Sequence, residues 1–309
     1  YIAGAELNVA TALALWKVPS KYITALPDNN LSRQIVSFLE LQKIDMSPVL
    51  YQPGRLGLYY LTKGRDLKND ALIYDRANSA FSKLKPGMID WDKQFEGVTW
   101  FHFSAICPAI NQNIADVCHE ALVAASQRDI TISVDLNYRS KLWQYGKNPQ
   151  EVMPQLVKYC DVRMGNIWAA DMMLDIPVTP DIHESGQKSI YLKEALKTSE
   201  EITGQYPQCK IVANTFRFDE QSKINYYATL YSGGKFYSSN EYATTKIISK
   251  VGSGDCFMAG LIYGFYNYFD PKQSLEFAAI AAFEKLFIES DTINITAEKL
   301  LLKLNNWPG

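Results

Sequence analysis

Residues 250–260, KVGSGDCFMAG, have the residue types and spacing that best fit chemistry. Two glycines, a serine and Asp255 come directly before an apolar run, LIYGFYNYF, that predicts a buried helix. A helix N-terminus attracts anions through its free N–H groups and its dipole, and glycines let the backbone approach a phosphate closely. Asp255 would then be a general base beside an anion site, or it would simply cap the helix. These few residues alone slightly favour the cap.

Motifs of other common catalytic classes are absent from the sequence. It contains no G-x-x-x-x-G-K-[ST], and Phe257 occupies the place of the third glycine of G-x-G-x-x-G. H-E-x-x-H and G-x-S-x-G are also missing. With only three histidines, a His-based triad or metal centre is not expected, and we interpret His119 as a surface or packing residue.

The composition fits one cytoplasmic domain with small-molecule partners. The 309 residues leave room for one large α/β domain with a substantial core. The 31 basic residues nearly balance the 33 acidic ones, so neither nucleic acid nor an anionic membrane is an expected partner. Five scattered cysteines without a C-x-x-C pair argue against a zinc cluster or a disulfide framework. No apolar run approaches the ~18 residues of a membrane span, and the first residues do not form a signal peptide.

The order of predicted elements is typical of a mostly parallel sheet covered by helices. Apolar β-rich runs alternate with segments of helical period. We expect strands at residues 22–26, 98–103, 130–134 and 210–213. An amphipathic crossover helix should begin at Pro108, and residues 57–77 and 224–239 predict antiparallel hairpins. The second hairpin should turn at Gly233-Gly234, and the first predicts a small flap on the single domain.

Polar residues directly after the predicted strands are candidates for ligand binding, because ligands of open α/β sheets bind at the carboxyl ends of the strands. These candidates are Ser104, Asp135, Asn137, Arg139, Asn166, Thr215 and Arg217. For each single residue, an ordinary polar loop explains its presence about as well as a ligand does.

Several separated motifs together resemble the ribokinase-like (PfkB) carbohydrate kinases. KVGSGDCFMAGLIYG resembles their C-terminal signature, D-T-x-G-A-G-D followed by a helix, and AGAELNVA resembles the N-terminal signature G-G-A-x-x-N-V-A. Four segments match, in order, the pattern of the 2-keto-3-deoxygluconate kinases within that family: RLGLYYL (55–61), ALIYDRANSAFS (71–82), WFHFSAICPAI (100–110) and VDLNYRSKLW (134–143). The resemblance covers nearly the whole chain. It implies an α/β fold of three α/β/α layers around a mostly parallel sheet, with a β lid from about 55–77.

The resemblance also implies a reaction. The γ-phosphoryl group of ATP would move to a sugar acid, 2-keto-3-deoxygluconate, giving the 6-phosphate. Asp255 would take the hydroxyl proton, and Gly252, Ser253 and Gly254 would offer N–H groups to the phosphate. Mg²⁺ would be held largely through waters, with the protein ligands unknown, and a monovalent cation is a further candidate. The family's substrate positions match Gly4, Asn8, Tyr59, Tyr74, Arg76, Ile106, Arg139 and Asp291. Its nucleotide positions match Asn137, Arg139, Asn166, Thr215, Arg217, Gly252 and Gly254.

Tyr74 and Arg76 on the flap distinguish a sugar-acid kinase from a kinase of neutral sugars. A guanidinium group matches a carboxylate through two parallel bonds. Arg139 lies in a D-x-N-x-R element that fructokinases share, so it does not discriminate. There are structural alternatives to substrate binding. The tyrosine would simply pack in the flap, and either arginine would form a solvated salt bridge. The functional alternatives are a fructokinase or ribokinase-like enzyme, and a sugar-binding regulatory homologue with weak catalysis.

The sequence departs from the family pattern at several positions. Ser249 and Lys250 stand where an acidic residue and a threonine are usual, and Ala169 replaces a carboxylate three residues after Asn166. The change at Ala169 predicts weaker magnesium binding and a lower rate. The printed chain begins at the first signature, so the family's opening strand is expected to be missing from the domain at 1–309. A flap exposed at an edge predicts a homodimer or higher homo-oligomer.

Overall fold

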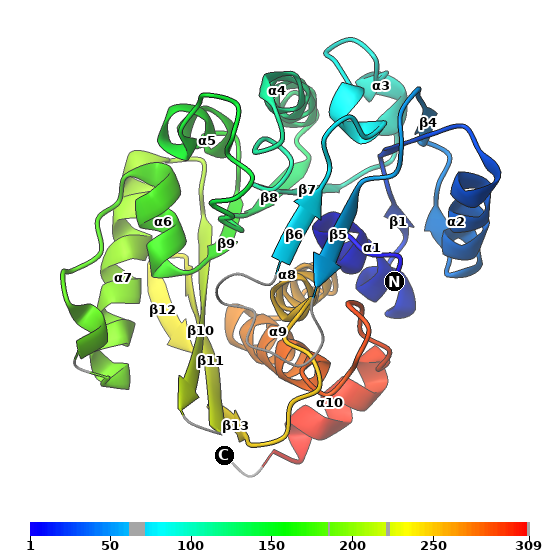
Figure 1. Cartoon of the computed structure of the whole chain (residues 1–309). Coiled ribbons are helices and arrows are strands. Elements are labelled where there is room, and N and C mark those ends of the chain that lie inside the picture. Colours follow the sequence, from blue (N-terminus) through cyan, green and yellow to red (C-terminus); the bar gives the residue numbers. More distant parts are fainter. Residues whose placement is uncertain (62–71, 185, 221–222, 308–309) are drawn as a thin grey trace.

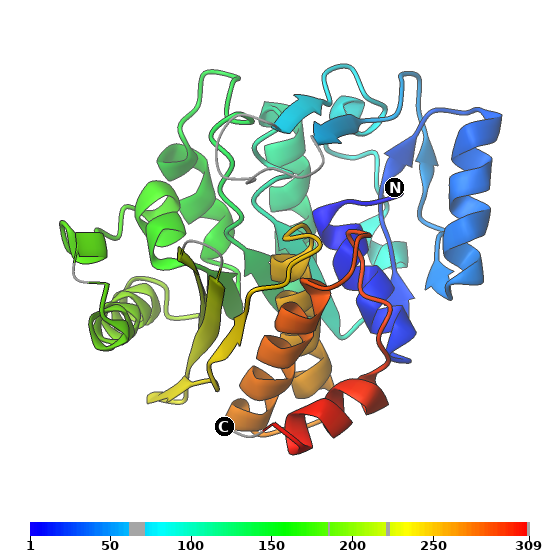
Figure 2. The same cartoon turned by 60° about the horizontal axis from the view of Figure 1, so that its bottom comes forward.

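The central sheet joins a parallel half to an antiparallel half. In the computed structural model, which describes residues 1–61, 72–184, 186–220 and 223–307, the strand order is β12–β11–β10–β9–β8–β7, with β13 paired to β11 (Figure 1, Figure 2). The parallel half comprises β7 (Trp100–Ser104), β8 (Thr131–Asp135), β9 (Val162–Gly165) and the first residues of β10 (Ile211–Glu220). The antiparallel half comprises the rest of β10 with β11 (Lys223–Ser232), β12 (Lys235–Ser238) and β13 (Tyr242–Thr244).

Helices cover both faces of this sheet and complete the expected α/β/α layers (Figure 1). One face carries α4 (Gln112–Ser126), α5 (Pro149–Val157), α6 (Ile167–Leu174) and α7 (Lys188–Gln205). The other face carries α1 (Ala5–Leu15), α8 (Ser253–Tyr266), α9 (Pro271–Lys285) and α10 (Ala297–Asn305). Short helical turns lie at η1 (Phe81–Lys83), α3 (Trp91–Gln94) and η2 (Ile182–Glu184). The fold class predicted from the sequence is therefore confirmed.

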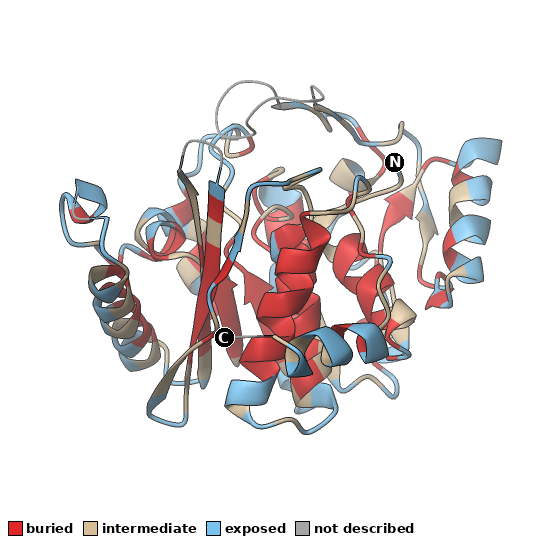
Figure 3. Ribbon diagram, turned by 90° about the horizontal axis from the view of Figure 1, so that it is seen from below, coloured by how far each residue is buried: buried red, intermediate tan, exposed pale blue. Residues whose placement is uncertain are grey.

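Helices α8 and α9 pack against each other and are buried in the layer that carries the candidate active site. Both are apolar around most of their circumference, and Figure 3 shows buried residues along their length. Gly260 permits their close approach, because a Cβ atom there would lie 2.6 Å from the Cα of Ala278. The predicted crossover helix is α4, which begins at Gln112 rather than at Pro108. Asn111 caps it by accepting a hydrogen bond from the N–H of Ile114.

The chain between α1 and the flap forms only short strands beside α2 (Asn30–Leu41). β1 (Ser20–Lys21) pairs with β3 (Ile44–Asp45), and β2 (Ala25–Leu26) pairs with β4 (Leu50–Tyr51), both in parallel. The strand predicted at 22–26 is therefore wrong except at its last two residues. The two partner strands, β3 and β4, are separated by a turn that contains Pro48. Proline has no N–H to donate to a β ladder, so the pairing is divided into two short segments.

Both predicted hairpins have their strands in place. β5 (Leu58–Leu61) and β6 (Leu72–Asp75) pair antiparallel in the flap, while the flap's turn lies outside the described residues. β11 and β12 turn at Gly233 and Gly234, whose φ angles of 58° and 73° suit a tight hairpin. The strand predicted at 210–213 is too short, because β10 continues to Glu220 by pairing with β11. Thr215 and Arg217 therefore lie within a strand, not after one.

A cavity of about 1060 Å³ lies between β7 and the short strand β1. Its walls include Tyr22, Trp100 and His102, with α1 and α3 closing other sides. Across the described residues, β7 pairs with β8 only. Among the helices of the described chain, none combines the length and apolar character that crossing a bilayer requires.

Candidate active site

The site is built at the first turn of α8, beyond the carboxyl ends of the parallel strands. Gly252 is the N-cap of this helix with φ of 76°, and a Cβ there would lie 1.8 Å from the carbonyl oxygen of Asp291. Only glycine fits this position. Asp255 is the third residue inside the helix, so the capping role that the sequence slightly favoured is wrong. Its carboxylate instead accepts a hydrogen bond of 2.6 Å from Nδ2 of Asn8.

The remaining residues of this turn leave room for an anion. The hydroxyl of Ser253 donates to the carbonyl oxygen of Ala282, and the thiol of Cys256 donates to that of Ala281, so both side chains point back into α9. Gly254 is exposed and has no side chain. Since the N-terminal N–H groups of a helix lack partners within it, this turn can bind a phosphate.

Asp255 is a buried carboxyl group with a moderately raised pKa. Burial raises the pKa to about 6, the hydrogen bond from Asn8 opposes that rise, and the charge of Glu6 adds to it. The charges of Arg139 and Lys285 lower the pKa. Asp255 is therefore ionised at neutral pH, as a general base must be. Oδ1 of Asn8 is buried and has no protein partner among the described residues, so it can accept a hydrogen bond from a sugar hydroxyl.

A second carboxyl group, Asp135, lies at the end of β8 close to Asp255. Burial and the charge of Asp255 raise the pKa of Asp135 to about 8, while the charge of Arg139 opposes the rise. The backbone N–H of Asn137 donates to it. Asp135 was only one of several polar residues after strands in the sequence, and its place beside the base was not predicted. Paired carboxyl groups with separated pKa values are common in catalytic sites.

Glu6 organises the floor of the site from α1. Its carboxylate accepts hydrogen bonds from the N–H and hydroxyl of Ser104, at 2.9 and 2.6 Å, and from the thiol of Cys107. The hydroxyl of Ser104 in turn accepts from the N–H of Ile106. Sequence reasoning missed Glu6, although its position two residues before Asn8 in the N-terminal signature was a usable signal. Gly4 lies just before this helix, beside the hydroxyl of Tyr22.

The flap reaches the site through two of its predicted residues. The hydroxyl of Tyr59 donates to the carboxylate of Asp291, which ties the flap to the loop that packs on Gly252. The guanidinium of Arg76 lies 5.0 Å from the centre of the Tyr74 ring. Burial raises the pKa of Tyr22, and the positive charge of Arg76 opposes only part of that rise. Tyr59 and Tyr74 lie opposite each other in the β5–β6 pair, and with Arg76 and Asp291 they form one cluster.

The residues predicted for the nucleotide are more dispersed. Asn166 caps α6 by accepting from the N–H of Ala169, so its amide oxygen is engaged. The hydroxyl of Thr215 donates to the carbonyl oxygen of Gly165 at 3.4 Å. Arg217 projects from β10 with a buried Nε that has no protein partner among the described residues.

Lys250 connects the two parts of this region. Its ammonium group donates to Asp219 at 2.8 Å, which joins the end of the β10–β11 hairpin to the loop before Gly252. The side chain of Arg139 is exposed, its Nη1 donates to the carbonyl of Tyr138, and its charge acts on both Asp135 and Asp255.

The described residues do not supply a metal centre. No group of three or more His, Cys, Asp or Glu side chains in that part of the chain is arranged to hold a metal ion. Ala169 occupies the position where the family pattern has a carboxylate, and its side chain is buried in the core. The donor set thus fits a Mg²⁺ ion only if nucleotide phosphates and waters provide its ligands.

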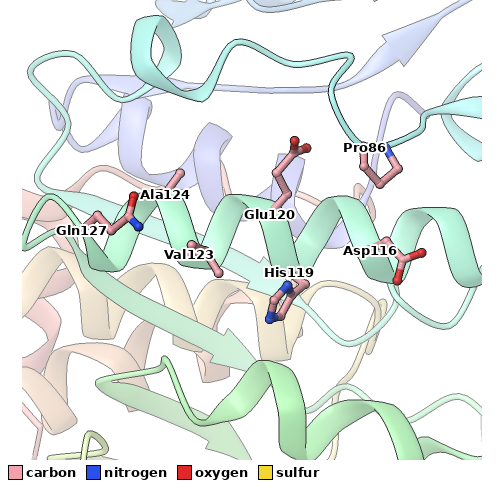
Figure 4. A pocket seen from close by; sticks show the side chains of 7 residues that line it. All are labelled: Pro86, Asp116, His119, Glu120, Val123, Ala124 and Gln127. Atoms are coloured by element: carbon pink, nitrogen blue, oxygen red, sulfur yellow. The ribbon is translucent and has the colours of Figure 1, made fainter.

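A second hollow, of about 590 Å³, lies on the outer side of α4 and is separate from this chemistry. Figure 4 shows its lining residues, with Glu120 and His119 pointing to opposite sides of the helix. Glu120 accepts hydrogen bonds from the backbone of Gly87 and from the Trp91 ring, while His119 contacts the ring of Tyr159. His119 is exposed, so of the two roles expected for it, surface or packing, the structure supports the surface residue.

Comparison with known proteins agrees with this geometry. Residues 1–199 match the family described as pfkB family carbohydrate kinase. The chain belongs to this family. The crystal structure of 2-dehydro-3-deoxygluconokinase from Thermotoga maritima is similar to the chain, with a TM-score of 0.88 and 31% identity, covering 98% of this chain and 90% of that one.

Two curated relatives are similar in sequence over a smaller share of the chain. The 2-dehydro-3-deoxygalactonokinase of Haloferax volcanii is 33% identical over 141 residues, which is 46% of this chain and 44% of that enzyme. This match therefore spans less than half of the Haloferax enzyme. The 2-dehydro-3-deoxygluconokinase of Thermoproteus tenax is 22% identical over 285 residues, or 91% of this chain and 77% of that enzyme.

Proposed function

We propose that this pfkB family member transfers the γ-phosphoryl group of ATP to 2-keto-3-deoxygluconate, forming the 6-phosphate. The observation that carries the proposal is the buried, ionised Asp255, held by Asn8 at the open first turn of α8. The Thermotoga enzyme, which is similar over nearly the whole chain, acts on the same kind of sugar acid according to its name.

In the proposed mechanism, Asp255 accepts the proton of the attacking sugar hydroxyl. The hydroxyl oxygen forms a bond to the γ-phosphorus, the bond to the β-phosphate oxygen breaks, and ADP leaves. The N–H groups of Gly252, Ser253 and Gly254 stabilise the charge on the transferred group, and Arg139 adds a positive charge beside it. A Mg²⁺ ion on the nucleotide neutralises phosphate charge when bound; a monovalent cation is a further proposed cofactor.

Arg76 is the residue that would make the enzyme prefer an acidic sugar. Its guanidinium packs against the ring of Tyr74, on a flap that Tyr59 holds to Asp291. A sugar carboxylate there would form charge-assisted hydrogen bonds with the guanidinium group, whereas a neutral sugar would not. Losing one such bond costs about 1.5–3 kcal/mol, which corresponds to roughly a 10- to 100-fold loss in kcat/KM.

A coupled ADP-release assay tests the substrate. We expect kcat/KM for 2-keto-3-deoxygluconate to be well above that for fructose or ribose. Arg76→Ala should lower it by about 10- to 100-fold for the acid and change it little for a neutral sugar. Arg76→Lys should restore only part of the activity. Arg55→Ala is the matched control, because Arg55 lies on the same flap but pairs with Asp75.

Three results would contradict parts of this assignment in different ways. A preference of the wild-type protein for fructose or ribose would indicate a neutral-sugar kinase. Binding of the acid in a thermal-shift assay without any ADP release would indicate a regulatory homologue with weak catalysis. Equal losses in Arg76→Ala on acid and neutral sugars would mean that Arg76 only braces the flap.

The proposal extends to the cellular setting. Five free cysteines fit a reducing cytoplasm. Leu58, Tyr60 and Ile73 on the outer face of the flap are 42%, 55% and 61% exposed, and such an apolar face fits contact with the flap of a second copy in a homodimer.

A further inference from the structure

Lys285 is a fully buried lysine that no step of the proposed mechanism uses. It is the last residue of α9, and its relative exposure is 0%. Its ammonium group donates a hydrogen bond of 3.0 Å to the carbonyl oxygen of Ile288. Burying a lysine is costly, so a cation in this place needs compensating interactions. Its position at the C-terminal end of a helix supplies one, because a positive charge there meets the negative end of the helix dipole.

The end of α9 lies directly against the beginning of α8. Ser253 and Cys256 donate from the first turn of α8 to carbonyl oxygens of Ala282 and Ala281 in the last turns of α9. The two helices therefore join the positive end of one dipole to the negative end of the other. Lys285 lies at this junction, where the charge of Asp255 acts on it and where its own charge acts on Asp255.

The first turn of α8, with Gly252 before it, is the proposed phosphate-binding turn. The loop that follows Lys285 touches this turn on two sides. The carbonyl oxygen of Leu286 accepts hydrogen bonds from the N–H groups of Ile248 and Ser249, just before the turn. The carbonyl oxygen of Asp291 packs against Gly252, and the side chain of Asp291 holds the flap. The bond from Lys285 to Ile288 fastens the middle of this loop.

The charge of Lys285 is present at neutral pH. Burial lowers the pKa of Lys285 to about 8, and the negative charge of Asp255 opposes that fall. Lys303, on the next helix, α10, offers a contrast. It pairs at 2.7 Å with Glu284, the neighbour of Lys285, from the surface of α10.

We infer that Lys285 is a positioning residue that acts as a built-in cation, fixing the loop at 286–291 and through it the phosphate-binding turn and Asp255. This inference rests on the proposed kinase activity for its catalytic consequence. Lys285 has no place among the substrate contacts, so its loss should affect turnover rather than sugar binding. A hole left by its ammonium group, beside the Ile288 carbonyl oxygen, would suit a small monovalent cation.

The test compares Lys285→Met with the control Lys303→Met. Lys285→Met should lower kcat by about 10- to 100-fold, the cost of misplacing catalytic groups by about 1 Å, with KM for the sugar acid within about three-fold of wild type. Ammonium or potassium chloride should restore part of this kcat, whereas the bulkier tetramethylammonium chloride should not. Backbone hydrogen exchange at 286–293 should become faster in Lys285→Met. The control should match wild type in all these measurements.

The inference is overturned if folded Lys285→Met keeps the kcat and the loop protection of wild type. Equal recovery with tetramethylammonium would also overturn it, since ionic strength would then explain the effect. Should Lys285→Met fail to fold, Lys285→Gln retains a donor for Ile288 without the charge, and wild-type kcat and exchange in it would refute the ionic role. Absence of kinase activity in the wild type would defeat the proposed function, while the exchange data would still decide the role of Lys285.

Discussion

Replacing Asn8 by alanine should move the acid limb of the pH–rate profile to higher pH. In the wild type, Nδ2 of Asn8 donates to the Asp255 carboxylate at 2.6 Å within a buried site. A hydrogen bond to the charged form of a carboxyl group lowers its pKa, so removing the bond raises the pKa of Asp255. More of the base is then protonated at neutral pH and cannot accept the hydroxyl proton.

The size of this change follows from the bond that is lost. A hydrogen bond to a charged group is worth about 1.5–3 kcal/mol, and 1.36 kcal/mol corresponds to one pH unit. The acid limb should therefore move up by about one to two pH units from its wild-type position, set by the Asp255 pKa of about 6. At pH 7 the ionised fraction of Asp255 would fall from about nine-tenths to between about one-half and one-tenth.

The assay is kcat/KM for the sugar acid from pH 5 to pH 9 in wild type and Asn8→Ala. If Asn8 also accepts a sugar hydroxyl through its free Oδ1, the plateau at high pH will drop as well, but the limb will still move. Thr11→Val, on the same helix, serves as the control, because the described residues show a side-chain hydrogen bond to Asp255 from Asn8 and none from Thr11. An acid limb at the wild-type pH in Asn8→Ala, whatever the plateau, would refute the assignment of Asp255 as the base held by Asn8.

Three further outcomes are expected from the same site. Asp255→Asn should lose about 100-fold or more in kcat while still binding the sugar acid by calorimetry, because it keeps the shape but cannot accept a proton. In the wild type, activity should fall above about pH 8, because ionised Asp135 repels the incoming phosphate. Asp135→Asn should abolish this fall in the alkaline limb of the pH–rate profile. Gly252→Ala should lower the melting temperature and the activity together, because its Cβ would collide with the backbone of Asp291.

The sequence predicted those parts of the fold that depend on local patterns. Strands near β7 and β8 were expected within two residues of their observed ends, since continuous apolar runs bounded by polar residues are strong signals. The flap and the turn at Gly233-Gly234 were expected for similar reasons. β10 was predicted too short, because its second half alternates aromatic and polar residues and is stabilised by its partner β11, which lies later in the chain.

The site residues differ in how far the sequence could place them. Asp255 and Asn8 are 247 residues apart, so neither spacing nor period predicts their hydrogen bond, and only family resemblance pointed to both. Lys285 follows an apolar run in α9 and would ordinarily be expected to reach water at the helix end. It is buried instead because α8 begins where α9 ends, an arrangement set by the close contact at Gly260. The same contact that packs two apolar helices thus brings an anion site, a base and a buried cation together. A change at Gly260 should therefore disturb catalysis as well as stability.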